Sequence, residues 1–360
     1  MKEPENQTLQ KISRSLIPMA FGDAVNAEPK DGVVLAADIG GTKTDLALLQ
    51  IKEGRFTILK EDKFQTENHK SILEIIASFH GKDLPSIDNV CLGIAGPIID
   101  GKVEGTNFPW EIDGDKIGRE LKSDSVHLIN DMEANAYGLA GLEEKDLLIV
   151  QPGTDSKGNA AIISPGTGLG EAGLYWDGSH YHPFATEGGH CDFSPGTKLD
   201  VDLWNHLRTK FGHVSWEKVV SGQGIDNIYE FLKGYRNHTE PEWLKKRLLT
   251  EDSSEVITEI ALQGKDAVCV ETLALFLEYL AREAAQLGLK IKAQGGIYIG
   301  GGILPHIARF IDTEIFSNNF LHAGRMNALL ETIPINVVLN TKTALMGAAY
   351  YGAMANGTKG

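Results

Sequence analysis

The chain contains two glycine-rich turns, and each stands between two apolar runs. The first stretch reads VVLAADIGGTKTDLALLQI, from Val33 to Ile51, and the second reads AIISPGTGLGEAGLYW, from Ala161 to Trp176. Two apolar runs joined by a tight Gly/Thr turn predict a β-hairpin. Glycine adopts the positive φ that such turns need, and it has no Cβ to block a close approach. A chain with two such hairpins, far apart in sequence, is expected to fold as two related halves.

Turns of this kind present several backbone N–H groups in one direction, and such concavities bind anions. Two copies would grip a polyphosphate from opposite sides, which predicts a nucleotide between the halves and phosphoryl transfer as the chemistry. Asp38 ends the run before the first turn, where it can orient the water molecules of a Mg²⁺ ion. The alternative is a plain hairpin with an aspartate at its turn. The predicted phosphate ligands are Gly40, Gly41 and Thr42 in the first turn and Gly166, Thr167 and Gly168 in the second.

A third glycine cluster, Gly300 to Gly302, follows an apolar run and precedes a helix-like segment. Ligands commonly bind at such strand-to-helix turns, so Gly301 is assigned to the adenosine side of the nucleotide.

An Asn-Asp pair follows another apolar run, in the segment LINDMEAN. In phosphoryl transfer, Asp131 would be the general base that accepts the proton of a substrate hydroxyl, and Asn130 would bind a neighbouring hydroxyl. The alternative role for Asp131 is that of N-cap of the following helix, which is common for aspartate.

Two further segments carry polar side chains beside glycines. In TEGGH, Glu187 and His190 can point at one small polar ligand, although a structural histidine is the alternative. In HVSWEKVVSGQG, Glu217 adds a carboxylate, although this segment alone is also typical of a helix with a C-terminal glycine cap. Zinc is not expected, since zinc sites usually have tighter, cysteine-rich spacing. The residues weighed for it are His180, His182, His190 and Cys191.

The composition limits the classes of partner that the chain is expected to bind. The formal net charge is −15 and no Lys/Arg run offsets it, so nucleic acid is not an expected partner. Three widely spaced cysteines, an odd number, indicate a reducing compartment, which predicts a cytoplasmic protein. No apolar stretch is long enough to span a bilayer, and the N-terminus lacks the pattern of a secretory signal, so no membrane partner is expected.

Strand-like and helical runs alternate, which favours an α/β fold. Residues 1–31 are interpreted as a polar N-terminal extension with a short helix around Leu9–Leu16. Residues 32–141 plus 341–360 are expected to form a small α/β domain, and residues 142–340 a large domain. Strands are predicted at 33–39, 46–51, 56–61, 89–94, 126–130, 147–150, 160–164, 296–299 and 335–339. Helices are predicted at 71–80, 114–122, 131–138, 269–289 and 343–354.

Seven motifs occur in order between Val33 and the C-terminus: LAADIGGTKTDLAL, GIAGPIIDGKVEGTNFPW, LINDMEAN, SPGTGLG, EGGHCDF, HVSWEKVVSGQG and GGIYIGGGILP. In their order and spacing they closely resemble those of the bacterial glucokinase family, within the hexokinase–actin–Hsp70-like ATPase superfamily. The resemblance implies a two-domain actin-like ATPase fold, of the duplicated ribonuclease H-like type. A small α/β domain and a larger α+β domain would stand around a cleft.

The resemblance also implies an activity and its residues. The expected reaction is ATP-dependent phosphorylation of D-glucose to glucose 6-phosphate, with Mg-ATP as donor, feeding glycolysis. Asp131 would be the catalytic base, Asp38 and the two glycine-rich turns would bind the phosphates, and the chain would form a homodimer. The implied sugar ligands are Asn107, Asn130, Asp131, Glu187, His190 and Glu217.

The chain departs from the family pattern at two places. Lys43 stands where the family usually has Asn, and Ser164-Pro165 precedes the second turn in place of a Gly-Ala pair. The related ROK sugar kinases also contain Gly-Gly-Thr-Lys, but their Cys-x-Cys-Gly zinc pattern is missing here. Two other functions stay open. One is a kinase for another hexose or an N-acetylhexosamine. The other is a non-catalytic sugar sensor on the same fold, against which Asp131 argues because a sensor needs no base.

Overall fold

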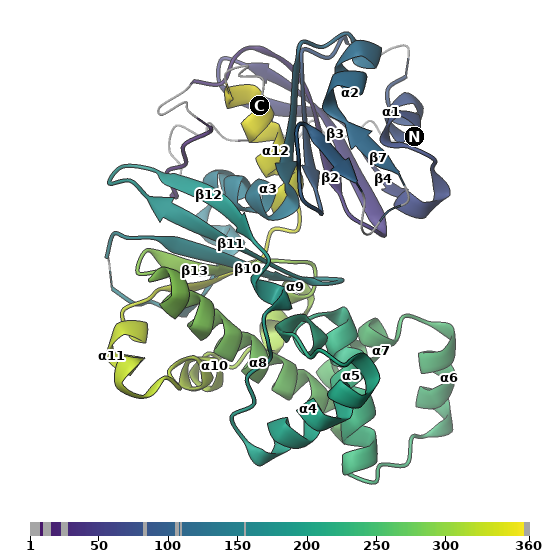
Figure 1. The fold of residues 1–360 in the computed structure, drawn as a ribbon, viewed down its shortest axis with the longest axis vertical. Coiled ribbons are helices and arrows are strands. Elements are labelled where there is room, and N and C mark those ends of the chain that lie inside the picture. The colour runs from purple at the N-terminus through teal and green to yellow at the C-terminus, as the bar shows by residue number, and fades with distance from the viewer. Residues whose placement is uncertain are drawn as a thin grey trace. The chain divides into compact units, whose positions relative to one another are not determined.

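A computed structural model describes residues 8–9, 16–22, 28–81, 85–104, 108, 110–154 and 156–355. The chain divides into two compact units (Figure 1). Unit 1 comprises Met1–Lys145, Leu174–Ala185 and Lys342–Gly360, and unit 2 comprises Asp146–Gly173 and Thr186–Thr341. Residues 342–355 therefore belong to the same unit as residues 28–81.

Unit 1 is built on a six-stranded sheet. β2 (Gly32–Ile39) and β3 (Lys43–Lys52) pair antiparallel around the first glycine-rich turn, so the predicted hairpin is confirmed. β5 (Asn89–Ile94) and β8 (Ser125–Asn130) extend the sheet parallel to β2, so the C-terminal ends of these three strands share one edge. The strand order is β1 (Thr8–Leu9), β4 (Arg55–Gln65), β3, β2, β5 and β8, and a separate pair consists of β6 (Lys102–Glu104) and β7 (Glu111–Asp113).

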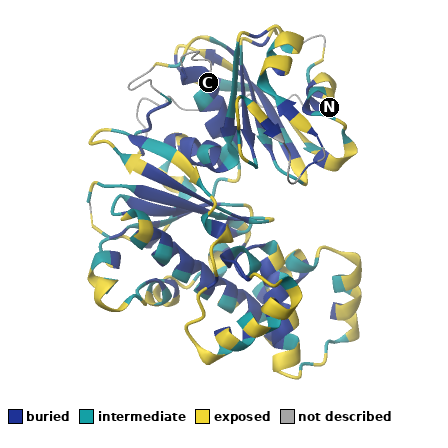
Figure 2. Cartoon of the chain, viewed as in Figure 1, coloured by how far each residue is buried: buried dark blue, intermediate teal, exposed yellow. Residues whose placement is uncertain are grey.

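Helices pack on this sheet, whose strands are largely buried (Figure 2). Successive side chains of β2 point to opposite faces of the sheet, as the two-residue period of a strand requires. Val33 and Leu35 share a core with α1 (Ile72–Phe79), whereas Val34 lies close to Gly352 of α12 (Thr343–Met354). The other helices of unit 1 are α2 (Gly114–Leu121) and α3 (Asp131–Gly138), and α3 packs against α12.

The N-terminal segment differs from the polar extension that the sequence predicts. Thr8–Leu9 forms a strand against β4, and Leu16 is not helical. Further along, Phe21 stacks on Tyr137 of α3 with ring centroids 5.3 Å apart, and Ala20 N–H donates to Tyr181 O at 3.0 Å. Burial of this short apolar run outweighs the polar composition around it. Its buried side chains are Ile17, Met19, Ala20 and Phe21.

The second glycine-rich turn joins β10 (Ala160–Pro165) to β11 (Leu169–Trp176), so the second predicted hairpin is also confirmed. β13 (Gly296–Ile299) lies parallel to β10, and β14 (Ile335–Val338) lies parallel to β13. The hydrogen-bonded order is β12 (Tyr181–Thr186), β11, β10, β13, β14 and β9 (Leu147–Gln151). This sheet is therefore mixed, with β9 antiparallel at one edge.

Helices form the rest of unit 2. The longest is α8 (Ala267–Ile291), which begins where the Asp266 carboxylate accepts the N–H groups of Val268 and Cys269, at 2.9 and 3.0 Å. In the part of the chain that the structure describes, no helix is both long enough and apolar enough to cross a membrane. The other helices are α4 (Lys198–Phe211), α5 (Gly222–Tyr235), α6 (Glu242–Thr250), α7 (Ser253–Leu262), α9 (Leu304–Ile307), α10 (Thr313–Phe320) and α11 (Asn327–Leu330).

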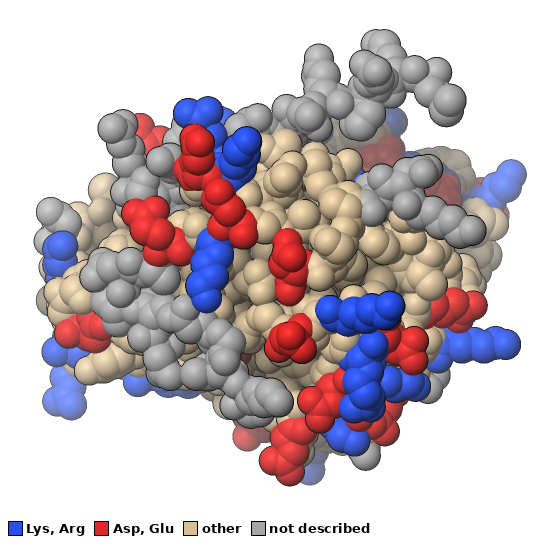
Figure 3. Space-filling view, turned by 90° about the horizontal axis from the view of Figure 1, so that it is seen from above, with Lys and Arg blue, Asp and Glu red and all other residues tan. Residues whose placement is uncertain are grey.

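The surface carries charges of both signs. On the face shown in Figure 3, acidic and basic side chains are interspersed around an uncharged area. The net charge of −15 is therefore not gathered into one acidic patch on this face.

Candidate active site

Three parallel strands of unit 1 bring predicted site residues to one edge of the sheet. Asp38 is the penultimate residue of β2, and Asn130 is the last residue of β8. β5 lies between them, with Gly93 opposite Asp38 and Ile94 opposite Asn130. Asp131 begins α3 directly after β8, and its charge acts on the Asp38 carboxyl. The structure therefore places the predicted general base beside the predicted magnesium residue.

The first turn of α3 fixes the orientation of Asn130. Its Oδ1 accepts the N–H of Met132 at 2.8 Å, and the Glu133 carboxylate accepts the N–H of Asn130 at 3.4 Å. These two bonds form a capping box, so the N-cap of α3 is Asn130, and the alternative that gave this position to Asp131 is wrong. Because Oδ1 is engaged, the amide Nδ2 of Asn130 is the group that can donate to a ligand.

The Asp38 carboxyl lies in surroundings that disfavour its negative charge. Burial, followed by the charges of Asp131 and Asp45, raises its pKa to about 7, and Lys63 opposes this only in part. Lys63 Nζ lies 3.0 Å from Asp45 Oδ2, whereas the buried Asp45 Oδ1 has no hydrogen-bond partner among the described residues. A group of carboxylates of this kind favours a cation, and oxygen ligands suit Mg²⁺. The residues present thus fit a magnesium ion held through water.

The first glycine-rich turn uses part of its own backbone. Gly40 N–H donates to Lys43 O at 2.9 Å, and Thr66 Oγ1 donates to Gly40 O at 2.9 Å. The N–H of Gly40 therefore closes the turn and is not directed to a ligand. A phosphate group at this turn would meet Gly41 and the exposed Thr42.

The second turn has the same construction, since Gly166 N–H donates to Gly168 O at 2.8 Å. The Glu217 carboxylate lies against this turn, where its Oε2 accepts the N–H of Leu169 at 3.2 Å. Gly222 N–H, at the start of α5, donates to Gly166 O at 2.9 Å. Gly222 thus opens a helix, and the interpretation of this segment as a helix closed by glycine is wrong. A predicted sugar ligand and a predicted phosphate loop lie together in unit 2.

The third glycine cluster packs on the second turn. It connects β13 to α9, as the sequence predicts, and Gly300 N–H donates to Ile163 O at 2.8 Å. Gly301 adopts a φ of +88°, and a Cβ at this position would overlap the carbonyl oxygen of Pro165. Only glycine allows this approach. Gly301 and the exposed Thr167 consequently belong to one glycine-rich surface of unit 2.

Glu187 precedes a short 3₁₀ turn, Gly188–His190, and His190 is its last residue. Their side chains are 75% and 61% exposed, and Glu187 Oε2 lies 3.9 Å from His190 Nε2. Trp216 N–H donates to Cys191 O at 3.0 Å, which joins this segment to the one that carries Glu217. The three predicted sugar ligands of unit 2 therefore lie on neighbouring segments.

Two further points of the sequence analysis concern Asn107 and the residues weighed for zinc. Asn107 lies outside the described residues, so its position is not given. His182 pairs with Asp177, Nε2 to Oδ2 at 2.7 Å, and Cys191 is exposed and forms no disulfide. Among the residues that the structure describes, no group of three or more His, Cys, Asp or Glu side chains is arranged to hold a metal ion directly.

Sequence reasoning missed three acidic residues near the site. Glu133 accepts the backbone N–H of Ala185 as well as that of Asn130, and burial raises its pKa. The spacing Asn-x-x-Glu before a helix is the signal that predicts such a capping box. Glu171 and Glu283 are almost completely buried, at 1% and 0% exposure. The sequence signal for Glu283 is its position as a charged residue within an apolar helical stripe. No sequence signal indicates Glu171.

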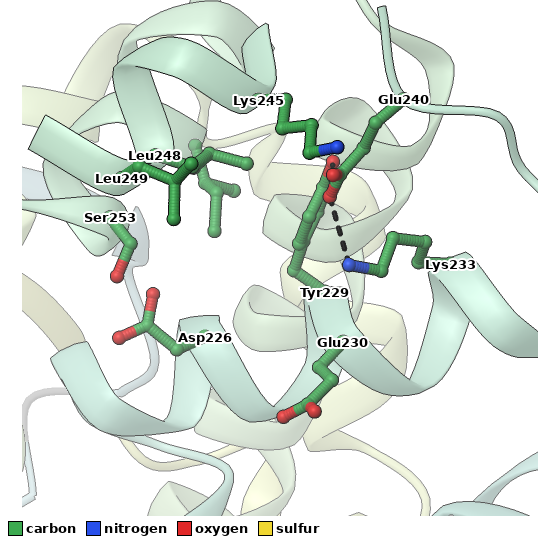
Figure 4. Close-up of a pocket in the computed structure, with 10 residues that line it drawn as sticks. Asp226, Tyr229, Glu230, Lys233, Glu240, Lys245, Leu248, Leu249 and Ser253 are labelled. Atoms are coloured by element: carbon green, nitrogen blue, oxygen red, sulfur yellow. Dashed lines mark hydrogen bonds and ion pairs between the residues drawn. The ribbon is translucent and has the colours of Figure 1, made fainter.

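A pocket also opens on unit 2 between α5, α6 and α7 (Figure 4). Its polar walls are partly neutralised by their own contacts, since Glu240 Oε1 accepts from Lys233 Nζ at 3.0 Å and from Tyr229 Oη at 3.1 Å. None of the residues predicted from the motifs lines it. In each unit the candidate site residues therefore lie at its own glycine-rich turn and the acids around that turn, and not at this pocket.

Comparison with known proteins identifies the family of the chain. The family model described as Glucokinase matches residues 35–355. A glucokinase from Nostoc sp. is 38% identical over 338 residues, covering 89% of this chain and 99% of the relative, and one from Synechocystis sp. is 37% identical over 352 residues, covering 89% and 98%. The crystal structure of a glucokinase from an Antarctic psychrotroph superimposes with a TM-score of 0.71 at 30% identity, covering 89% of this chain and 98% of that one. These matches confirm the fold class and the resemblance that the motifs indicate, and the chain belongs to the glucokinase family.

Proposed function

We propose that the chain transfers the γ-phosphoryl group of Mg-ATP to the 6-hydroxyl of D-glucose and so supplies glucose 6-phosphate to glycolysis. Membership of the glucokinase family makes the chain a sugar kinase. The observation that carries the proposal is the placement of Asp131 beside Asp38, at the strand edge next to the first glycine-rich turn. A base and a phosphate-binding turn must be neighbours for a hydroxyl to attack a phosphoryl group.

Asp131 acts as the general base. Its carboxylate accepts the proton of the sugar 6-hydroxyl while the oxygen bonds to the γ-phosphorus, and the bond from that phosphorus to the bridging oxygen of ADP breaks. Asp131 is the first residue of α3, directly after the last residue of β8. In the same turn, the Asn130 Nδ2 group donates to a neighbouring sugar hydroxyl.

The remaining sugar ligands match the chemistry of a hexose. Its hydroxyls both donate and accept, and carboxylates, an amide and an imidazole satisfy both roles. Glu187 and His190 are exposed on their turn, and Glu217 is held by Leu169 N–H. Asn107 completes the proposed set.

The nucleotide is held mainly by backbone. Gly41, Thr42, Thr167 and Gly168 surround its phosphates, and Gly301 lies on the adenosine side. Asp38 would hold a magnesium ion through its water molecules. That ion, when bound, neutralises the charge of the phosphates and polarises the γ-phosphoryl group.

The proposal also covers the cellular compartment and the oligomeric state. The three cysteines are free, which suits the reducing cytoplasm. A homodimer is proposed from the family resemblance, and light scattering on the purified chain tests it.

A coupled assay of ADP release tests the reaction itself. We expect glucose-dependent ADP formation and a product that glucose-6-phosphate dehydrogenase oxidises. Mannose and N-acetylglucosamine in the same assay test the alternative of another hexose kinase. Glucose binding without any ADP release would favour the sugar sensor and would overturn the proposal.

A further inference from the structure

Two buried carboxylic acids lie in unit 2 beneath the turn that carries Glu187 and His190. Glu171 belongs to β11 and Glu283 to α8, and their exposures are 1% and 0%. Both oxygens of Glu171 and Oε2 of Glu283 are buried and have no hydrogen-bond partner among the described residues, and the charge of Glu171 acts on the Glu283 carboxyl. Two interacting negative charges without hydrogen-bond partners are costly in a buried space, so one of the two acids carries a proton.

Glu171 is in direct contact with the turn. The backbone of Gly188 approaches it so closely that a Cβ on this residue would overlap Glu171 Oε2. Thr186 adds a second link, since its Oγ1 donates to Glu171 O at 3.1 Å and accepts Gly188 N–H at 3.3 Å. Neither oxygen of the Glu171 side chain has a hydrogen-bond partner among the described residues. The Glu171 carboxyl thus packs directly against the backbone of the turn and supports it.

The charges around the pair favour one shared proton. Burial, followed by the charge of Glu171, raises the pKa of Glu283 to about 8, and burial raises the pKa of Glu171. Lys290 of α8 opposes both shifts from 3.3 Å, Nζ to Glu283 Oε1, but its side chain is 45% exposed. The covering turn carries Glu187 and His190, which point largely into solvent. The pair therefore holds its proton at neutral pH.

We propose that Glu171 and Glu283 are positioning residues, a pair of carboxylic acids that shares one proton and sets the position of the sugar-binding turn Thr186–His190. This inference rests on the proposed role of Glu187 and His190 as sugar ligands. It adds two residues that touch neither sugar nor nucleotide but hold the ligands in place.

The pair gives glucose affinity a dependence on pH. Below about pH 8 the shared proton links the two acids. As the pH rises through this value the proton is lost, and two adjacent negative charges repel each other in a buried space. Glu171 then presses against Gly188, the turn shifts, and KM for glucose rises. The folded chain binds this proton and the unfolded chain has released it above its ordinary glutamate pKa, so the stability of unit 2 also falls between these two pKa values as the pH rises.

Substitution of Glu171 separates positioning from general stability. In Glu171→Gln, the amide donates to Glu283 without a shared proton, so KM for glucose at pH 7 stays close to that of the native chain and its rise between pH 7.5 and 9 is lost. In Glu171→Ala, the carboxyl that supports the turn is removed. KM for glucose should then increase by about 10-fold or more, with KM for ATP unchanged. Glu271→Gln, a surface carboxylate of α8 paired with Arg236, is the matched control and should keep the native pH profile.

The measurement is KM for glucose and ATP from pH 6.5 to 9, together with the dissociation constant of glucose by calorimetry on the full chain. Glu187→Gln is assayed in parallel. If Glu187→Gln weakens glucose binding while Glu171→Gln keeps the native pH profile, the positioning pair is refuted and the sugar site stands. If Glu187→Gln leaves glucose binding unchanged, the sugar site itself is wrong and the positioning proposal falls with it. Should Glu171→Ala fail to fold, the profile of Glu171→Gln still decides.

Discussion

Replacing Gly93 with alanine should displace the proposed catalytic base through the helix that carries it. Gly93 lies on β5 under the first turn of α3, and a Cβ there would stand 2.8 Å from Ala134 Cβ, 3.4 Å from Ala37 O and 3.9 Å from Asp131 Cα. Carbon atoms in contact lie about 3.5–4.0 Å apart, so the first turn of α3 must move by roughly 1 Å. Asp131 stands at the start of that turn and moves with it.

Two effects follow from such a shift. Overpacking of this kind costs about 1–3 kcal/mol of stability, and a misplacement of about 1 Å at a reacting group costs on the order of 10²-fold in rate. We therefore expect Gly93→Ala to lower kcat by about 10²-fold, with a lower unfolding temperature in calorimetry. KM for ATP should stay close to the native value.

A second substitution identifies the cause. Gly93→Ala combined with Ala134→Gly removes the atom that clashes, and most of the lost kcat should return, although glycine in a helix costs about 1 kcal/mol. Gly234→Ala in α5, where a Cβ meets no atom within 4 Å, should leave kcat unchanged. A Gly93→Ala variant with native kcat, or a double variant no faster than Gly93→Ala alone, refutes the close packing of β5 and α3 as the device that places Asp131.

Three further perturbations test other parts of the site. Glu217→Gln keeps an oxygen that can accept the Leu169 N–H but loses the charged acceptor for the sugar. KM for glucose should therefore rise about 10-fold with KM for ATP unchanged. A rise in KM for ATP alone contradicts the assignment of Glu217 to the sugar. Phe21→Ala removes a buried ring stacked on Tyr137 and should cost unit 1 about 3–5 kcal/mol, measured by calorimetry; a native unfolding temperature would mean that residues 16–22 do not stabilise the unit. Chelation of divalent ions should abolish turnover and magnesium should restore it, whereas zinc should not; activity in the presence of a chelator removes Asp38 from its magnesium role.

The hairpins and the site edge were accessible from sequence because their signals are local. Apolar runs around a glycine turn determine β2 and β3, and the same pattern determines β10 and β11. An apolar strand ending in Asn-Asp placed α3 directly after β8, with Asp131 as its first residue. Each of these assignments depends on residues close together in the chain.

Other features depend on contacts between distant segments. Glu171 and Glu283 meet only because β11 packs near α8, and no local pattern reports the meeting of two acids 112 positions apart (283 minus 171). Residues 16–22 are a short apolar run within a mostly polar segment, and their burial depends on partners at Tyr137 and Tyr181. Long-range packing therefore overrode the local interpretation at both places, as it commonly does for weak local signals.

The most direct test of the account is the pairing of turnover with glucose binding in Asp131→Asn. The amide retains the shape of the side chain but cannot accept the hydroxyl proton. We expect kcat for glucose phosphorylation to fall by about 10²–10⁴-fold, while the dissociation constant of glucose in calorimetry stays within a few-fold of the native value. An Asp131→Asn chain that turns over at close to the native rate would contradict the role of Asp131 as general base.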